Sequence, residues 1–265
     1  MQITNQTSPM KTVFISLLFV VGFTARAQTE EEIVDKRIDE ARKLFHFSQD
    51  YQAEMDKIVK DYPRSAYAWQ QKAMPLFKQG KYEYAMPFLD KAVALNPKLY
   101  MDYRAFMKCI FGKRYVEAIE DFEAAKKLSG NSYVMDHTYD FYIALSYLQL
   151  GRFAEAEQIL EADREAHLAT SSVEPHFLDV FYMGIAKYEL GKYEEAIAQF
   201  DISIGTYREF SDAEYYKALC LIKLGRNNEA EKLMQKAITD YRNGFTINED
   251  NVVYERYPYQ VYFLK

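Results

Sequence analysis

Glycine, proline and cysteine are all scarce in this chain of 265 residues, which contains 10, 7 and 2 of them. Few glycines and prolines leave long segments without a helix breaker, and 23 tyrosines and 18 phenylalanines supply bulky groups to pack between those segments. We therefore expect long helices. With 49% hydrophobic and 27% charged residues, the chain has enough apolar material for a core, which argues against disorder over most of its length.

An excess of positive charge is also missing. The formal net charge is −6, and Lys and Arg are spread singly along the sequence. Such a chain repels phosphate backbones on average, so we expect no nucleic-acid partner.

Motifs of catalysis and metal binding are absent from the sequence as well. The four histidines show neither HExxH nor i, i+4 spacing, and the two cysteines stand far apart. There is no glycine-rich phosphate loop and no GxSxG elbow. The sequence therefore predicts no enzyme, no metal and no cofactor.

The first segment has the pattern of a secretory signal peptide. Residues 12–23 form an apolar run that follows Lys11 and precedes an Ala-Arg-Ala sequence ending at Ala27. The run is too short to cross a hydrocarbon core, which needs about 20 residues, so we do not expect a membrane-spanning protein. We predict cleavage near Ala27, a mature start at Gln28 and a secreted or periplasmic location. Met10 gives a more typical positively charged opening than Met1 does.

A six-residue motif recurs along the chain. Residues 80–85 read GKYEYA, and relatives of this segment begin at positions 113, 151, 191 and 225, in steps of 33, 38, 40 and 34 residues. An apolar helical face precedes each motif, and the glycine can take the left-handed conformation that ends a helix. Alanine and an aromatic residue then recur at helical spacing, so the motif predicts two helices joined by a tight turn.

The segment 66–99 resembles a complete tetratricopeptide repeat (TPR), and the resemblance extends well over residues 66–240 and weakly over residues 31–64. Positions 73, 76, 89 and 92 also carry the alanines and leucines of that pattern. The residues that define the repeats are Trp69, Gly80, Tyr82, Ala85, Pro97, Tyr115, Ala118, Gly151, Phe153, Ala156, Gly191, Tyr193, Ala196, Gly225 and Ala230.

The resemblance implies an all-α, TPR-like superhelical solenoid of about five to six helix-turn-helix repeats. We divide the chain into a signal peptide (1–27), a degenerate helical repeat (28–64), a TPR array (65–240) and a C-terminal extended tail (241–265). Cys109 and Cys220 would lie three repeats apart, too far for a disulfide, so both should be buried free thiols.

Several positions depart from the family pattern. Phe106 stands where a small residue is expected, and the following turn lacks its glycine, so that helix pair should be splayed or differently turned. The longer steps imply extended helices or loops around residues 129–136 and 169–175. Pro75 and Pro87 fall inside expected helices, and each should kink or break its helix.

In this family the first helix of each repeat lines a concave groove, which here would be aromatic and aliphatic. Its candidate partner-binding residues are Tyr67, Gln70, Met74, Phe77, Tyr103, Met107, Phe141, Leu145, Phe181, Ile185, Tyr188, Tyr215 and Leu219. A stripe of this kind also arises where helices simply pack on one another. The alternative is an open apolar groove that awaits a partner, because large exposed apolar patches on soluble proteins usually serve binding.

We therefore expect a secreted interaction scaffold that binds a protein or peptide in this groove, without catalysis. The alternatives are a self-assembling structural subunit, for which a homo-oligomer would be expected, or an accessory factor of an envelope assembly complex. The tail offers a further hypothesis. Residues 245–265 are rich in aromatic and β-branched residues and contain Pro258, which favours extended chain. We expect this tail to fold back over the last repeats or into the groove.

Overall fold

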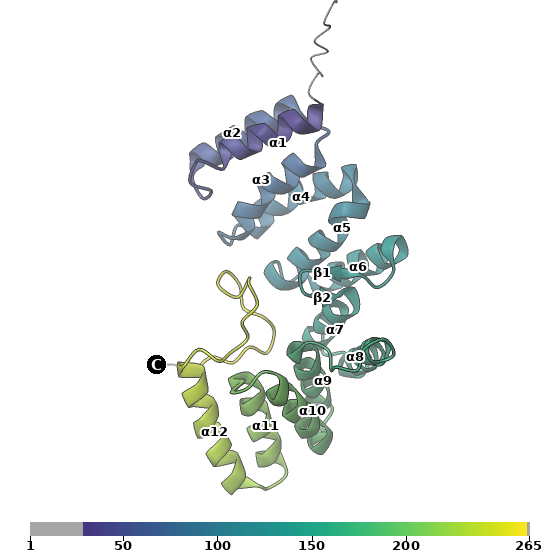
Figure 1. Ribbon diagram of the computed structural model, residues 1–265, viewed down its shortest axis with the longest axis vertical. Helices are drawn as coiled ribbons and strands as arrows, with labels where there is room; N and C mark the ends of the chain where they lie inside the picture. Colours follow the sequence, from purple (N-terminus) through teal and green to yellow (C-terminus); the bar gives the residue numbers. More distant parts are fainter. Residues whose placement is uncertain (1–28, 264–265) are drawn as a thin grey trace, which may run out of the picture.

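A computed structural model describes residues 29–263 of the chain, so the predicted signal peptide lies outside the described residues. The described part consists of helices, one two-residue hairpin and a non-helical C-terminal segment (Figure 1). The elements are α1 (Glu30–Ala41), α2 (Gln49–Asp61), α3 (Ala66–Phe77), α4 (Tyr82–Leu95), α5 (Pro97–Phe106), the π-helix η1 (Met107–Phe111), α6 (Tyr115–Ser129), β1 (Tyr133–Val134), β2 (His137–Thr138), α7 (Tyr139–Gln149), α8 (Phe153–Leu168), α9 (Phe177–Glu189), α10 (Tyr193–Thr206), α11 (Ser211–Lys223) and α12 (Asn227–Arg242).

Within residues 29–263 the helices stack as six antiparallel pairs in chain order, and each helix contacts the next one along the chain. Together they form an arc, and the C-terminal segment, yellow in Figure 1, lies within it. The predicted fold class is confirmed: an all-α, TPR-like solenoid with a short non-helical tail. In the part of the chain that the structure describes, no helix combines the length and the apolar character needed to span a bilayer.

The turn glycines adopt one common conformation. Gly80, Gly151, Gly191 and Gly225 have φ values of 73°, 72°, 74° and 76°, in the left-handed region where a side chain is strained. The backbone N–H of the residue after each glycine bonds to a carbonyl in the preceding helix, as Lys81 does with Leu76 at 3.0 Å. The prediction that these glycines end the first helices is confirmed.

The third pair turns differently, as its sequence predicts. The first helix of this pair ends in η1, in which the buried Phe111 packs edge to face on the equally buried Phe106. The turn then places Lys113, rather than a glycine, at a positive φ of 53°. A lysine in this conformation is strained, and its side chain is used elsewhere in the structure, as described below.

The small and aromatic residues of the motif form the seam between paired helices. Ala85, Ala118, Ala156 and Ala196 are all fully buried, and the aromatic residues that open the second helices pack partly buried against the same core. A methyl side chain lets two helix axes approach closely. The core is therefore a continuous row of such seams.

The two internal prolines do not interrupt their helices. α3 continues through Pro75 to Phe77, and α4 continues through Pro87 to Leu95. The expectation of a break was therefore wrong. Each proline removes one hydrogen bond to the carbonyl four residues earlier, and the packing of α3 on α4 tolerates this loss.

Both cysteines are free and buried, as predicted. Cys109 lies in η1, in the third helix pair, and Cys220 lies in α11, in the sixth. The four helices of the fourth and fifth pairs separate them. The Cys109 thiol lies 3.4 Å from the hydroxyl of Ser146. Burial raises the pKa of Cys109 to about 11 and that of Cys220 to about 12, which keeps both in the unreactive thiol form.

Candidate functional site

The C-terminal tail, residues 243–263, lies along the inner side of the arc (Figure 1). Its contacts extend from α11 back to the end of α3, so they span five of the six helix pairs. This placement agrees with the hypothesis that the tail folds back into the groove. The tail thus shows which surface of the solenoid holds a non-helical segment of polypeptide.

Asp212, in the first turn of α11, fixes the base of the tail. Its carboxylate accepts hydrogen bonds from the backbone N–H of Ile247 at 3.1 Å, the hydroxyl of Thr246 at 2.7 Å and the backbone N–H of Val261 at 2.6 Å. Burial raises the pKa of Asp212 to about 6, although these hydrogen bonds act in the opposite direction. One buried carboxylate thus joins both ends of the tail loop to the last repeat.

Aromatic residues hold the middle of the tail. The hydroxyl of Tyr182, on α9, donates to the carbonyl of Pro258 at 2.8 Å, and the neighbouring Tyr257 is buried. Tyr259 and Phe263 pack on Tyr216 and Tyr215 of α11 with ring centroids 5.9 and 5.7 Å apart. The tail therefore fills apolar surface that the first helices of the last two pairs would otherwise expose.

The far end of the tail reaches the second and third pairs. The Lys113 ammonium donates to the carbonyl of Arg256 at 2.8 Å and lies 3.4 Å from the Glu255 carboxylate. The hydroxyl of Tyr82 also bonds to Glu255, and the ammonium of Lys78 lies 4.9 Å from the ring centroid of Tyr254. Thus the strained Lys113 turn presents its cation to the tail.

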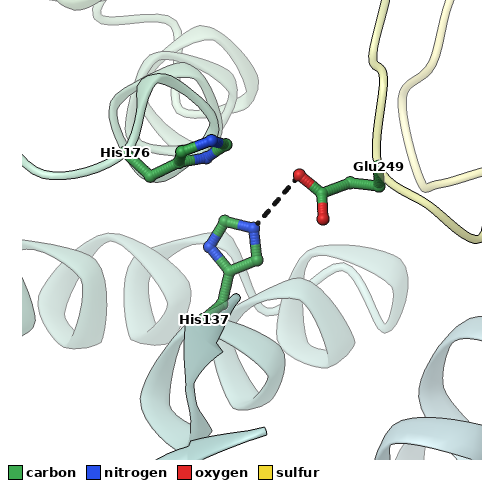
Figure 2. Close-up of side chains that lie close together, drawn as sticks. All are labelled: His137, His176 and Glu249. Atoms are coloured by element: carbon green, nitrogen blue, oxygen red, sulfur yellow. Dashed lines mark hydrogen bonds and ion pairs between the residues drawn. The ribbon is translucent and has the colours of Figure 1, made fainter. Parts of the chain in front are cut away.

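A cluster of two histidines and one glutamate lies where the tail passes the fourth and fifth pairs (Figure 2). His137 belongs to β2, His176 is the N-cap residue of α9, and Glu249 belongs to the tail. One ligand-type atom from each of the three residues lies within 4.8 Å of those of the other two. No sequence pattern predicted this cluster, because the three residues are far apart along the chain and only folding of the tail brings them together.

His137 is held firmly within this cluster. It is fully buried, and its ring stacks on Phe141 with centroids 3.8 Å apart. Its Nδ1 lies 2.8 Å from the Asp179 carboxylate, and its Nε2 lies 3.5 Å from that of Glu249. Burial lowers the pKa of His137, but the two carboxylates outweigh this effect and raise it to about 9. Burial and the neighbouring His137 lower the pKa of His176.

A second feature is an open pocket of about 760 Å³ at the N-terminal end of the solenoid. α1, the start of α3 and the start of α5 form it, and Tyr67 and Tyr100 line it together with four acidic residues of α1. Arg42 positions Tyr67 by donating to its hydroxyl at 2.8 Å. The tail contacts described above stop short of this pocket.

The predicted groove residues fall into two groups. Six are buried within the solenoid: Phe77, Met107, Phe141, Leu145, Phe181 and Ile185. Seven are half-buried: Tyr67, Gln70, Met74, Tyr103, Tyr188, Tyr215 and Leu219. The first group packs helix on helix, as the interpretation of the stripe as simple helix packing expected for many of these side chains. The role of all thirteen in binding a partner stays a prediction.

Comparisons with known proteins agree with the architecture. Residues 66–99 and 183–244 each match the family described as tetratricopeptide repeat. The fold is similar to a tetratricopeptide repeat protein from Parabacteroides merdae, with a TM-score of 0.63, 18% identity and 79% of each chain covered. No curated protein matches the sequence.

Two further solved structures share the fold. One is PilW, a widely conserved type IV pilus biogenesis factor, with a TM-score of 0.61, 16% identity and coverage of 81% of this chain and 94% of that one. The other is YrrB, a TPR protein with an unusual peptide-binding site, with a TM-score of 0.51, 19% identity and coverage of 70% and 91%. The chain is thus a TPR-like solenoid whose residues 66–99 and 183–244 match the tetratricopeptide repeat family.

Proposed function

We propose that this protein is a secreted or periplasmic interaction scaffold that binds an extended peptide or protein segment on the inner face of its solenoid. The observation that carries the proposal is the tail itself. A non-helical segment of about twenty residues already lies along this face and is held by backbone hydrogen bonds and aromatic packing. A surface that accepts a non-helical segment of its own chain has the groups needed to accept a segment of another.

The pocket at the N-terminal end is the proposed entry point for the partner. Its aromatic part, with Tyr67 and Tyr100, can contact apolar side chains, and its rim is acidic. Asp39 pairs with Arg42 at 2.8 Å, whereas Glu30, Glu31 and Asp35 have no ion-pair partner within residues 29–263. The pocket therefore favours a peptide that combines apolar residues with lysine or arginine. This role needs binding and no catalysis.

Selection of peptides from a random display library on the purified protein tests the proposal. We expect enriched peptides to carry basic and apolar residues, and to bind with one-to-one stoichiometry. Tyr67→Ala and Asp35→Lys should each weaken binding by about tenfold, or about 1.4 kcal/mol. Glu231→Lys, an equivalent charge reversal on the exposed surface of α12, is the matched control and should leave affinity unchanged.

The proposal fails if the enriched peptides bind equally well to the two pocket variants, or if no saturable binding is found. Analytical sedimentation of the same samples examines the competing role as a self-assembling subunit. A concentration-dependent homo-oligomer that Tyr67→Ala disrupts would favour self-assembly over an external partner.

The proposed location has its own test. N-terminal sequencing of the protein recovered from the periplasm or the medium should give a chain that starts at Gln28. A chain that keeps residues 1–27 and stays in the cytoplasm would contradict secretion and leave the binding proposal to be judged by the peptide experiment.

A further inference from the structure

We propose that His137, His176 and Glu249 form a binding site for a divalent metal ion of the zinc class, which fastens the C-terminal tail to the fourth and fifth helix pairs. Two histidines and one carboxylate are donors that Zn²⁺ commonly binds in proteins. One ligand-type atom from each residue lies within 4.8 Å of those of the other two. The inference is independent of any partner that the solenoid binds.

The geometry around His137 resembles an oriented metal ligand. Its Nδ1 makes a short contact of 2.8 Å with the Asp179 carboxylate, which fixes the ring and directs Nε2 toward Glu249. A carboxylate that holds one nitrogen of a metal-binding histidine in this way is a common second layer of zinc sites. Stacking on Phe141 further restricts the ring.

The contact between His137 and Glu249 is of a different kind. Nε2 and Oε1 are 3.5 Å apart, longer than an ordinary N–H···O hydrogen bond. Two ligands on adjacent corners of a zinc tetrahedron, each about 2.0–2.1 Å from the metal, lie about 3.3 Å apart. The pair is therefore already spaced for a shared ion. On binding, the metal would take the place of the Nε2 proton, which leaves to solvent.

His176 completes the set from the other side. It is exposed, has no hydrogen-bond partner for its ring within residues 29–263, and lies with its ring centroid 5.0 Å from that of His137. In Figure 2 both His176 and the Glu249 carboxylate lie above His137, with His176 to the left and Glu249 to the right. Because the side chain is exposed, a small rotation can bring a ring nitrogen to the ion, and solvent can reach a fourth coordination position.

The local charge also favours a cation. The carboxylates of Asp179 and Glu249 lie 2.8 and 3.5 Å from the two ring nitrogens of His137, and the neighbouring Asp136 is exposed. A divalent ion would balance these carboxylates while connecting three segments of the chain: the β1–β2 hairpin, the start of α9 and the tail. Such a link would hold the tail against the fourth and fifth pairs.

The first experiment measures metal binding by the purified, chelator-treated protein, with Zn²⁺ titrated against a chromogenic chelator and Co²⁺ followed by its visible absorption. We expect one ion per chain and a tetrahedral Co²⁺ spectrum. His176→Ala and Glu249→Gln should each weaken Zn²⁺ binding by about tenfold or more. His46→Ala removes another exposed histidine and is the matched control, which should bind as the parent does.

The second experiment asks whether the ion fastens the tail. Trypsin can cut after Arg256, and Zn²⁺ should slow this cleavage in the parent and in His46→Ala but not in His176→Ala. Because His176 is exposed, its replacement should leave the fold intact, which thermal unfolding without metal would verify. The proposal is overturned if the parent binds no Zn²⁺ with one-to-one stoichiometry, if His46→Ala weakens binding as much as His176→Ala, or if bound Zn²⁺ leaves the cleavage rate unchanged.

Discussion

The carboxylate of Asp212 accepts the backbone N–H of Val261 at 2.6 Å, although 49 residues separate them in the sequence. The same carboxylate binds the start of the tail loop, so a single buried side chain near the start of α11 fixes both of its ends. The tail is therefore an integral part of the last repeat.

Replacement of Asp212 should loosen the tail. Asp212→Ala leaves the N–H groups of Ile247 and Val261 without their acceptor, and we expect a loss of about 2 kcal/mol in the free energy of unfolding. Thermal or denaturant unfolding measures this loss. Asp201→Ala is the control, because Asp201 makes only an exposed ion pair with Lys217 and its removal should cost at most about 1 kcal/mol. Equal effects of the two substitutions would contradict the role given to Asp212.

The stability of the protein should also depend on pH through Asp212. Its folded pKa of about 6 lies above the value of about 3.9 expected in the unfolded chain. Between these values the folded state binds more protons than the unfolded state, so this group stabilises the fold at low pH and the contribution is lost as the pH rises through about 6. Unfolding of the parent and of Asp212→Asn, compared at about pH 4 and pH 7, isolates the effect.

The expected difference is on the order of 2 kcal/mol, with the parent losing more stability than Asp212→Asn as the pH rises. Other carboxylates titrate in both proteins and cancel in the comparison. Parallel pH profiles for the two proteins would show that Asp212 keeps an ordinary pKa.

Deletion of residues 245–265 should expose apolar surface on the inner face. Tyr182 would lose its hydrogen bond to the carbonyl of Pro258, and Tyr216 would lose its packing against Tyr259. The truncated chain should therefore bind a hydrophobic dye and tend to aggregate. Dye fluorescence and light scattering measure both effects. A truncated protein as soluble and as stable as the parent would show that the tail is dispensable for covering this face.

The sequence predicted the array well because each repeat contains the residues that determine its own turn and helix pairing. Gly80, Gly151, Gly191 and Gly225 fix the turns, and buried alanines such as Ala196 mark the seams. Local periodicity therefore gave the helices, their pairing and the departure at the third pair. These features depend on residues within about forty positions of one another.

The site depends on contacts that no local pattern records. The cluster of His137, His176 and Glu249 requires the tail to cross the fourth and fifth pairs, and the β1–β2 hairpin that places His137 lies in a segment where the sequence predicted only a longer helix or loop. The same applies to Lys113, whose bond to Arg256 joins residues 143 positions apart. The predicted groove residues that proved buried recur at helical spacing. Inner-face residues and core residues share this spacing, so it does not distinguish the two.

The closest helix contact in the fifth pair gives a further prediction. Gly184, in α9, faces the ring of Phe200, and a Cβ added at this glycine would lie 2.5 Å from the nearest ring carbon. Phe200 is fully buried, so the ring has little room to move. Gly184→Ala should therefore destabilise the protein by about 1–3 kcal/mol, despite the better helix propensity of alanine. Thermal or denaturant unfolding gives the value.

Gly205, in α10, is the matched control, because no atom lies within 4 Å of the position that its Cβ would take. Gly205→Ala should stabilise the protein by about 0.5–1 kcal/mol, since alanine loses less backbone entropy in a helix. Opposite signs for the same substitution in neighbouring helices would show that the close approach of α9 to α10, rather than helix propensity, requires glycine at position 184. Stabilisation by both substitutions would mean that the two helices can separate without cost and that their seam is less tightly packed than the structure indicates.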